Sequence, residues 1–457
     1  MDRMGPLEAS FLHLEGPTTP MHVGSVGIFE GPPPDYDELV AFIASRLPRV
    51  PKYRQKVMFV PGELARPVWV DDPHFRVEYH VRHTALPRPG SDAQLRENVG
   101  RIMSQMLDRT KPLWEMWVIE GLPDDQWAVI SKVHHCMVDG ISGADLLTVL
   151  FELSPEASPI VPAPKWEPRP LPTNLELLKE AATDLVHEPQ VQLESLRRLY
   201  HDDHPMRDVL NDVAAGLKRA VELREPGHPS VLNGPIGAHR TWDFARVPLP
   251  EVKAAAKRCG GTVNDVVLAA LTQGFRELLL AHGEKLDEGH VVHSLVPVSV
   301  RQAEERNQFN TKVAAMVASL PTGIDDAKER LRRVAAQMKE LKESKETSAA
   351  HALTKLSGFA PPTLVAMFMH WAHGVVQSRV NTITTNVPGP QIPLYLRGRK
   401  MVAARPYVPL GVGIRLTVGI FSYDGNIDFG VTGDWDSMDH VDVLCRGVER
   451  SLVELCH

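Results

Sequence analysis

A proline-dense stretch, SPEASPIVPAPKWEPRPLPT at residues 154–173, divides the sequence into two parts of unequal length that each alternate strand-like and helix-like patterns. Such a stretch favours an extended, exposed segment that crosses from one part to the other. With 457 residues, the chain is also too long for one ordinary hydrophobic core. The sequence therefore predicts an α/β (α+β) protein with a cleft between two subdomains, where substrates commonly bind.

The predicted organisation has three parts. Residues 1–173 form an N-terminal subdomain, 174–237 a helical and then proline- and glycine-rich connector, and 238–457 a C-terminal subdomain. Alternating apolar residues predict strands at 22–30, 126–135 and 290–301, and a strand run at 415–434 that residues 423–426 divide by a hairpin turn. Helical spacing with capping residues predicts helices at 35–47, 142–153, 248–261, 262–283 and 361–376. The last of these is interpreted first as a buried or pocket-lining helix and second as a membrane-surface helix.

Composition limits the class of protein. The net charge of −7 argues against a nucleic-acid partner, because phosphate binding needs a basic face, although a weak membrane contact through a local apolar patch stays open. The four cysteines form no CxxC pair, which favours a reducing, cytoplasmic compartment. The sequence predicts neither a signal peptide nor a membrane-spanning helix.

The stretch HHCMVDG at residues 134–140 is the strongest chemical signal. A metal site is disfavoured, because the side chains of adjacent histidines in a strand point to opposite faces. Two structural histidines at a strand end remain an alternative. The third interpretation is catalytic: a strand end directs one imidazole into the cleft, Gly140 permits a tight path, and imidazole is well suited to proton transfer near neutral pH. Periodicity leaves open whether His134 or His135 faces the cleft, and Asp139 could lock the backbone path.

The same stretch resembles the HHxxxDG motif of the CoA-dependent acyltransferase superfamily. Further stretches resemble the bacterial wax ester synthase/acyl-CoA:diacylglycerol acyltransferase family, of the actinobacterial triacylglycerol synthase type. They are PLEASFLHLEGPTTPMHVG at 6–24, the PLW motif at 112–114, Asn264-Asp265, and TNVPGPQIPLYLRGRKM at 385–401. They follow the family's order over nearly the whole chain. Two residues depart from the family pattern, Glu8 where aspartate is expected and Arg306 where glycine is common.

This resemblance implies two chloramphenicol-acetyltransferase-like subdomains, each a mixed sheet flanked by helices. It implies transfer of an acyl group from long-chain acyl-CoA, which is a substrate rather than a cofactor, to diacylglycerol or a long-chain alcohol. No metal and no cofactor are expected. Water-insoluble substrates imply peripheral association with a membrane or lipid droplet. The alternatives are a condensation-like enzyme that uses a carrier-protein thioester, and a non-catalytic lipid-binding protein on the same fold.

The resemblance also implies roles for single residues. His135 is the expected general base, next to His134. Asn264 is a candidate to position the acyl carbonyl or the oxyanion, with helix capping as its alternative. Asp139 is expected to be structural, with Arg301 as a candidate partner. Further candidates near the site are Gly140; Asp265, which could equally be a helix first-turn charge; Trp114, interpreted first as a core aromatic; and Asn386, a polar contact beside a Pro-Gly-Pro loop.

Overall fold

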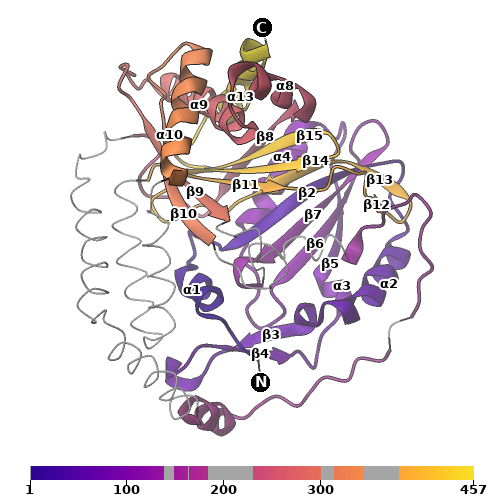
Figure 1. Ribbon diagram of the computed structural model, residues 1–457. Coiled ribbons are helices and arrows are strands. Elements are labelled where there is room, and N and C mark those ends of the chain that lie inside the picture. The colour runs from indigo at the N-terminus through magenta and orange to yellow at the C-terminus, as the bar shows by residue number, and fades with distance from the viewer. Residues whose placement is uncertain are drawn as a thin grey trace.

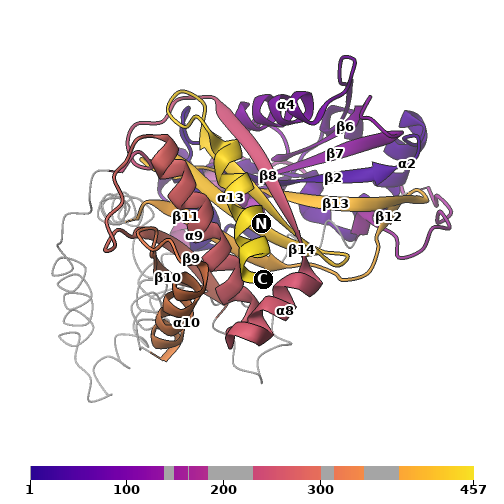
Figure 2. The ribbon, with the colours of Figure 1, turned by 90° about the horizontal axis from the view of Figure 1, so that it is seen from above.

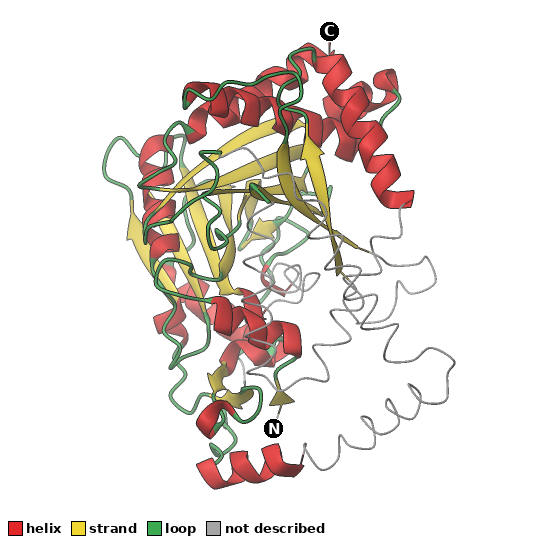
Figure 3. Cartoon of the chain, turned by 90° about the vertical axis from the view of Figure 1, so that its left-hand side faces the viewer, coloured by secondary structure: helices red, strands yellow, loops and turns green. Residues whose placement is uncertain are grey.

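The computed structural model describes residues 2–137, 149–162, 164–183, 230–299, 313–343 and 380–456. Within these ranges the chain forms two six-stranded sheets and one small three-stranded sheet. Helices lie around the sheets, as the red ribbons in Figure 3 show. The predicted mixed α/β class is confirmed.

The first large sheet has the strand order β12-β13-β2-β7-β6-β5. Only β5 and β6 run parallel, and the other neighbours are antiparallel. Apolar side chains alternate along β7: Trp127 and Val129 join the core under α1 and α2, whereas Ala128 and Ile130 join a second core with α4. The sheet is therefore buried on both faces. The bounds are β2 (His22–Glu30), β5 (Val81–Ala85), β6 (Trp114–Glu120), β7 (Gln126–His134), β12 (Tyr395–Leu396), β13 (Arg399–Tyr407), α1 (Pro6–Leu14), α2 (Tyr36–Arg46) and α4 (Asp92–Ser104).

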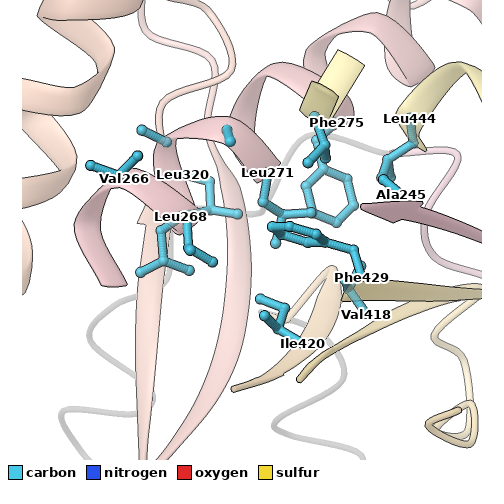
Figure 4. Close-up of a cluster of buried hydrophobic side chains, with 14 of the residues drawn as sticks. Ala245, Val266, Leu268, Leu271, Phe275, Leu320, Val418, Ile420, Phe429 and Leu444 are labelled. Carbon is cyan, nitrogen blue, oxygen red and sulfur yellow. The ribbon is translucent and has the colours of Figure 1, made fainter. Parts of the chain in front are cut away.

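The second large sheet has the order β10-β9-β11-β14-β15-β8, with β11 parallel to both β9 and β14. Four helices gather over one face of this sheet, at the top of Figure 1 and in front in Figure 2. Leu271 and Phe275 of one helix pack there against Val418 and Phe429 of the strands (Figure 4). The bounds are β8 (Arg240–Pro248), β9 (Val292–Ser299), β10 (Val313–Leu320), β11 (Thr382–Pro388), β14 (Leu416–Tyr423), β15 (Asn426–Asp434), α8 (Leu249–Cys259), α9 (Val263–Ala281), α10 (Ala327–Glu343) and α13 (Val441–Cys456).

The C-terminal half of the chain contributes two strands to the first sheet. β13 pairs antiparallel with β2, and β12 extends the same edge, so yellow strands lie beside the indigo β2 in Figure 2. The two large sheets meet where Trp242 of β8 donates its indole N–H to the Pro406 carbonyl at 3.2 Å. A Cβ atom at Gly430 of β15 would collide with that same carbonyl oxygen. The predicted subdomain boundaries stay a prediction, but the insertion of β12 and β13 into the first sheet connects the two sheets.

A small sheet lies beside the N-terminus, at the bottom of Figure 1. The small sheet has the order β1-β4-β3. Its bounds are β1 (Asp2–Arg3), β3 (Gln55–Met58) and β4 (Val68–Asp71), and α3 spans Val77–His80. No helix in the described part of the chain is long and apolar enough to cross a membrane.

Most sequence-predicted elements have the expected bounds. The strand 22–30 is confirmed, and the helices at 35–47, 248–261 and 262–283 are confirmed to within two residues at each end. The strand at 126–135 is one residue too long, because β7 ends at His134 and His135 begins a short 3-10 turn. The hairpin at 415–434 is confirmed, because β14 and β15 pair antiparallel on either side of the predicted turn. The helix at 361–376 and most of that at 142–153 lie outside the described residues.

Candidate active site

The two adjacent histidines lie at the end of β7, between its two neighbours in the sheet. The backbone N–H of His134 donates to the Leu113 carbonyl at 2.9 Å, and that of His135 donates to the Met21 carbonyl at 2.8 Å. Leu113 belongs to the PLW stretch, and Met21 belongs to the N-terminal stretch that resembles the family's opening. These two stretches therefore fix the backbone of the histidine pair from opposite sides.

His134 is fully buried and hydrogen-bonded by its own turn. Its Nδ1 accepts the backbone N–H of Cys136 at 3.1 Å. An acceptor nitrogen carries no proton, so Nδ1 is unprotonated and the ring N–H is the one on Nε2. Nε2 lies 3.4 Å from Glu15 Oε1, within ion-pair distance, and makes no hydrogen bond to the described residues. His134 is thus a structural member of the pair.

Glu15 is a buried carboxylate that the sequence analysis did not select. Arg109 holds it through Nε at 2.9 Å and Nη2 at 2.7 Å, both to Oε2, while the backbone N–H of Met21 donates to Oε1 at 3.1 Å. Burial alone would raise the pKa of the carboxyl, but the interactions with His134, Arg109 and Met21 lower it to about 2. Glu15 is therefore ionised at neutral pH.

One signal in the sequence points to Glu15. It follows the last residue of α1 directly, at the C-cap position. An acidic side chain is disfavoured there by the helix macrodipole, which favours cations at that end. Arg109 resolves the conflict, since its Nη2 also donates to the Leu12 carbonyl in the last turn of α1 at 2.9 Å. Arg109, which completes this network, is 94 positions away from Glu15 in the sequence.

His135 has a different environment. Its ring stacks on Phe11 of α1 with centroids 3.9 Å apart and planes 19° apart. The residue is partly exposed, whereas its Nδ1 is buried without a hydrogen-bond partner among the described residues. Burial lowers the pKa of the imidazole to about 4. His135 is consequently neutral at physiological pH and able to accept a proton.

Metal ligands and a thiol are the other reactive groups to consider beside the pair. The described residues contain no group of three or more His, Cys, Asp or Glu side chains placed to hold a metal ion. Cys136 is fully buried, and burial raises the pKa of its thiol far above the ordinary value, so the reactive thiolate is disfavoured. Of the two side chains in the pair, His135 is the candidate for acid–base chemistry.

A second polar cluster brings together two motifs that are distant in the sequence. Asn386 of β11 donates its amide to Asn264 Oδ1, in the first turn of α9, at 3.1 Å. The helix is capped by other residues: the Thr262 hydroxyl accepts the N–H of Asp265, and Asp265 Oδ2 accepts that of Thr262 at 2.8 Å. The capping alternative for Asn264 is therefore wrong, whereas the first-turn interpretation of Asp265 is confirmed.

The loop after Asn386 depends on a glycine. A Cβ atom at Gly389 would collide with the Ser422 carbonyl and the Phe421 ring, so only glycine fits between β11 and β14. The Pro-Gly-Pro stretch thus keeps the end of β11 close to β14, the strand with which Asn386 is in register at Ile420.

Trp114 is a core residue. It is 2% exposed, its indole N–H donates to the Tyr53 carbonyl at 2.8 Å, and its ring stacks on His80 with centroids 4.6 Å apart. The core interpretation is confirmed, and the PLW stretch contributes to the site through the Leu113 carbonyl. Three sequence-predicted residues, Asp139, Gly140 and Arg301, lie outside the described residues, so their roles stay predictions.

Comparisons with known proteins identify the family. The model of the wax ester synthase/diacylglycerol acyltransferase catalytic domain matches residues 4–267, and that of the WS/DGAT C-terminal domain matches residues 310–456. A Mycobacterium tuberculosis protein named probable diacylglycerol O-acyltransferase tgs1 is 32% identical over 461 residues, covering 100% of this chain and 96% of its own.

Solved structures share the fold. A wax ester synthase/diacylglycerol acyltransferase from Marinobacter aquaeolei VT8 has a TM-score of 0.68 and 26% identity, over 99% of this chain and 98% of its own. A trichothecene 15-O-acetyltransferase from Fusarium sporotrichioides has a TM-score of 0.62 at 12% identity, over 99% and 94% of the two chains. The latter similarity shows the fold alone.

Proposed function

The chain belongs to the wax ester synthase/diacylglycerol acyltransferase family, and from this membership we propose that it is an acyl-CoA-dependent O-acyltransferase that esterifies diacylglycerol. One observation supports the proposal for a particular residue, His135. A neutral, partly exposed imidazole, that of His135, stands at the end of β7 with its backbone held on one side and its ring stacked on Phe11. A general base has to be unprotonated at the working pH, and burial supplies that condition.

The proposed reaction is direct transfer in two steps. His135 takes the proton from the acceptor hydroxyl while the hydroxyl oxygen bonds to the thioester carbonyl carbon, which gives a tetrahedral oxyanion. The oxyanion then collapses, the carbon–sulfur bond breaks, and the departing CoA thiolate takes the proton from His135. No covalent enzyme intermediate, metal or cofactor is needed. Holding both substrates in line removes much of the entropy of their encounter.

Asn264 is the proposed donor to the oxyanion or the acyl carbonyl. Its Oδ1 accepts from Asn386, and its amide nitrogen makes no hydrogen bond to the described residues. The amide N–H groups of Asn264 are thus oriented by Asn386 and available to a ligand oxygen. One such donor typically supplies about 3 kcal/mol of transition-state stabilisation.

The substrates also suggest where the enzyme works. Long-chain acyl-CoA is amphiphilic and diacylglycerol is insoluble in water, so the chain has to meet its acceptor at a lipid surface. Peripheral association with a membrane or lipid droplet is part of the proposal, and co-sedimentation with diacylglycerol-containing vesicles measures it. A long-chain alcohol is the second candidate acceptor, because the family models and the Marinobacter relative carry wax ester synthase in their names.

The test is CoA release from palmitoyl-CoA by the wild type, His135→Ala and His134→Ala. Each is assayed with dipalmitoylglycerol, with hexadecanol and without acceptor. We expect acceptor-dependent release by the wild type, loss of at least about 100-fold in His135→Ala, and partial activity in His134→Ala, since removing a general base typically costs 10²–10⁴-fold.

Each other outcome has a definite meaning. Full activity in His135→Ala would contradict the assignment of the base while leaving the family membership in place. Binding of lipid without release of CoA by the wild type would favour the non-catalytic alternative. Release from an acyl-carrier thioester but not from acyl-CoA would favour the condensation-like alternative.

A further inference from the structure

The end of α1 contacts both histidines of the pair. Phe11 and Glu15 are four residues apart and therefore project from the same side of this helix. Phe11 stacks on the ring of His135 with centroids 3.9 Å apart, and Glu15 Oε1 lies 3.4 Å from His134 Nε2. Two side chains at one end of α1 thus contact the two neighbouring imidazoles.

Glu15 also reaches His135 through the backbone. Its Oε1 accepts the N–H of Met21, and the carbonyl of the same residue accepts the N–H of His135 at 2.8 Å. The carboxylate therefore holds His134 at its ring and His135 at its main chain. Because the side chain of Glu15 is only 1% exposed, water does not weaken these contacts.

Arg109 offsets the cost of burying the Glu15 carboxylate. An unpaired buried charge is strongly unfavourable, whereas two N–H groups of Arg109 converge on Glu15 Oε2. A third interaction ties Arg109 to the last turn of α1. The guanidinium thus fixes both the charge and the position of Glu15, and it leaves Oε1 free to face His134 and Met21.

We propose that Glu15, held by Arg109, is a positioning residue of the acyltransferase site, which fixes the Nε2–H tautomer of His134 and the backbone turn that presents His135. A proton on Nε2 leaves Nδ1 free to accept the Cys136 N–H, which closes the turn. Loss of the carboxylate charge weakens the preference for this tautomer, which the Cys136 N–H alone then supports. The inference rests on the proposed function, since it assigns a catalytic purpose to the turn.

The test combines a spectroscopic and a kinetic measurement on the full chain. The variants are Glu15→Gln, Arg109→Lys and Arg109→Gln. The control is Asp428→Asn, which removes another buried carboxylate held through both oxygens by one arginine, Arg246 at 2.9 and 3.1 Å, in the second sheet. Long-range ¹H–¹⁵N NMR of the imidazoles, assigned with His134→Gln, reports the tautomer without any need for turnover.

The expected result has a specific signature. In the wild type the His134 ring shows the Nε2–H pattern, and in Glu15→Gln this pattern is lost or mixed. Glu15→Gln lowers kcat about 10- to 100-fold and changes KM less than about 3-fold, since a base displaced by about 1 Å costs up to 100-fold. Arg109→Lys keeps more activity than Arg109→Gln. Asp428→Asn lowers the melting temperature but leaves kcat per folded molecule unchanged.

Two results would overturn the proposal. One is an unchanged His134 tautomer together with kcat within about 2-fold of the wild type in Glu15→Gln. The other is an equal loss of kcat in Asp428→Asn, because the effect would then be general destabilisation. If Glu15→Gln does not fold, the comparison of Arg109→Lys with Arg109→Gln decides. If the wild type shows no transfer, the proposed function fails, and the NMR result still accepts or rejects the tautomer assignment.

Discussion

At the scale of single residues, the two neighbouring histidines differ because the groups around them differ. His134 accepts a hydrogen bond at Nδ1 and has the Glu15 carboxylate 3.4 Å from Nε2. His135 instead stacks on an aromatic ring, and its buried Nδ1 has no hydrogen-bond partner among the described residues. Burial without a counter-charge disfavours the imidazolium and lowers the pKa of His135 to about 4. This difference in environment supports the assignment of the base more strongly than the order of the two residues in the motif.

The lowered pKa predicts a pH dependence of stability. Below pH 6.5, the ordinary pKa of histidine, the unfolded chain binds a proton at this position that the native chain does not accept until about pH 4. The free energy of unfolding therefore falls as the pH drops through this window, by about 2 kcal/mol at pH 5 for this residue. We expect the decrease between pH 7.5 and pH 5, measured by urea unfolding, to be smaller by about that amount in His135→Gln.

The control for this prediction is His239→Gln, because the side chain of His239 is exposed. This variant should show the same decrease in unfolding free energy as the wild type. An unchanged decrease in His135→Gln would mean that the imidazole is not kept neutral by burial. Other buried histidines, such as His22 and His80, are present in all three proteins and cancel in the comparison.

At the scale of elements, different residues at the start of α9 cap the helix and form the proposed site. Thr262 and Asp265 supply the reciprocal cap, so Asn264 adds nothing to helix termination. We expect Asn264→Ala to lower kcat about 100-fold, as loss of one oxyanion donor does, with little change in the free energy of unfolding. Thr262→Ala should do the reverse, with a loss of about 1 kcal/mol of stability and nearly unchanged kcat. Thermal unfolding and palmitoyl-CoA turnover of the two variants measure the contrast.

One outcome would contradict the role proposed for Asn264. If Asn264→Ala and Thr262→Ala lose stability and activity in the same proportion, Asn264 has only a structural role. Asn386→Ala provides a second check, because it removes the hydrogen bond that orients the Asn264 amide. Its kcat should lie between those of the wild type and Asn264→Ala.

Local elements could be predicted from the sequence, and their long-range partners could not. The alternation in HVGSVGIFE defines β2, and Thr262 followed by Asp265 defines the start of α9. Alternation shows which side chains face a core, but it does not show which strand lies alongside. The pairing of β13 with β2 depends on tertiary contacts between residues far apart in the sequence, as does the Glu15–Arg109 pair. The histidine site was found because its residues are contiguous.

At the scale of the whole molecule, the insertion of β12 and β13 into the first sheet is expected to couple the stability of the two large sheets. β13 completes the first sheet beside β2, while the adjoining Pro406 carbonyl receives the Trp242 indole of the second sheet. The core formed by α4 and the first sheet includes Trp242 and Tyr407. The two halves of the chain are therefore expected to unfold together, which keeps the histidine pair and the Asn264–Asn386 pair in one cooperative unit.

This expectation is tested at Gly430 of β15, which packs directly against the Pro406 carbonyl of β13. Gly430→Ala places a methyl group against the Pro406 carbonyl, and the resulting separation of the sheets should cost about 3 kcal/mol of unfolding free energy. Gly289→Ala is the control: its Cβ would lie 3.5 Å from Asp287 Oδ1, an ordinary contact, so stability should change by less than about 1 kcal/mol. In Gly430→Ala, hydrogen exchange should show equal losses of protection in β7 and β15, because both strands open in the same global unfolding step. Loss of protection confined to β15 would show that the first sheet is stable by itself and that β13 does not couple the two halves.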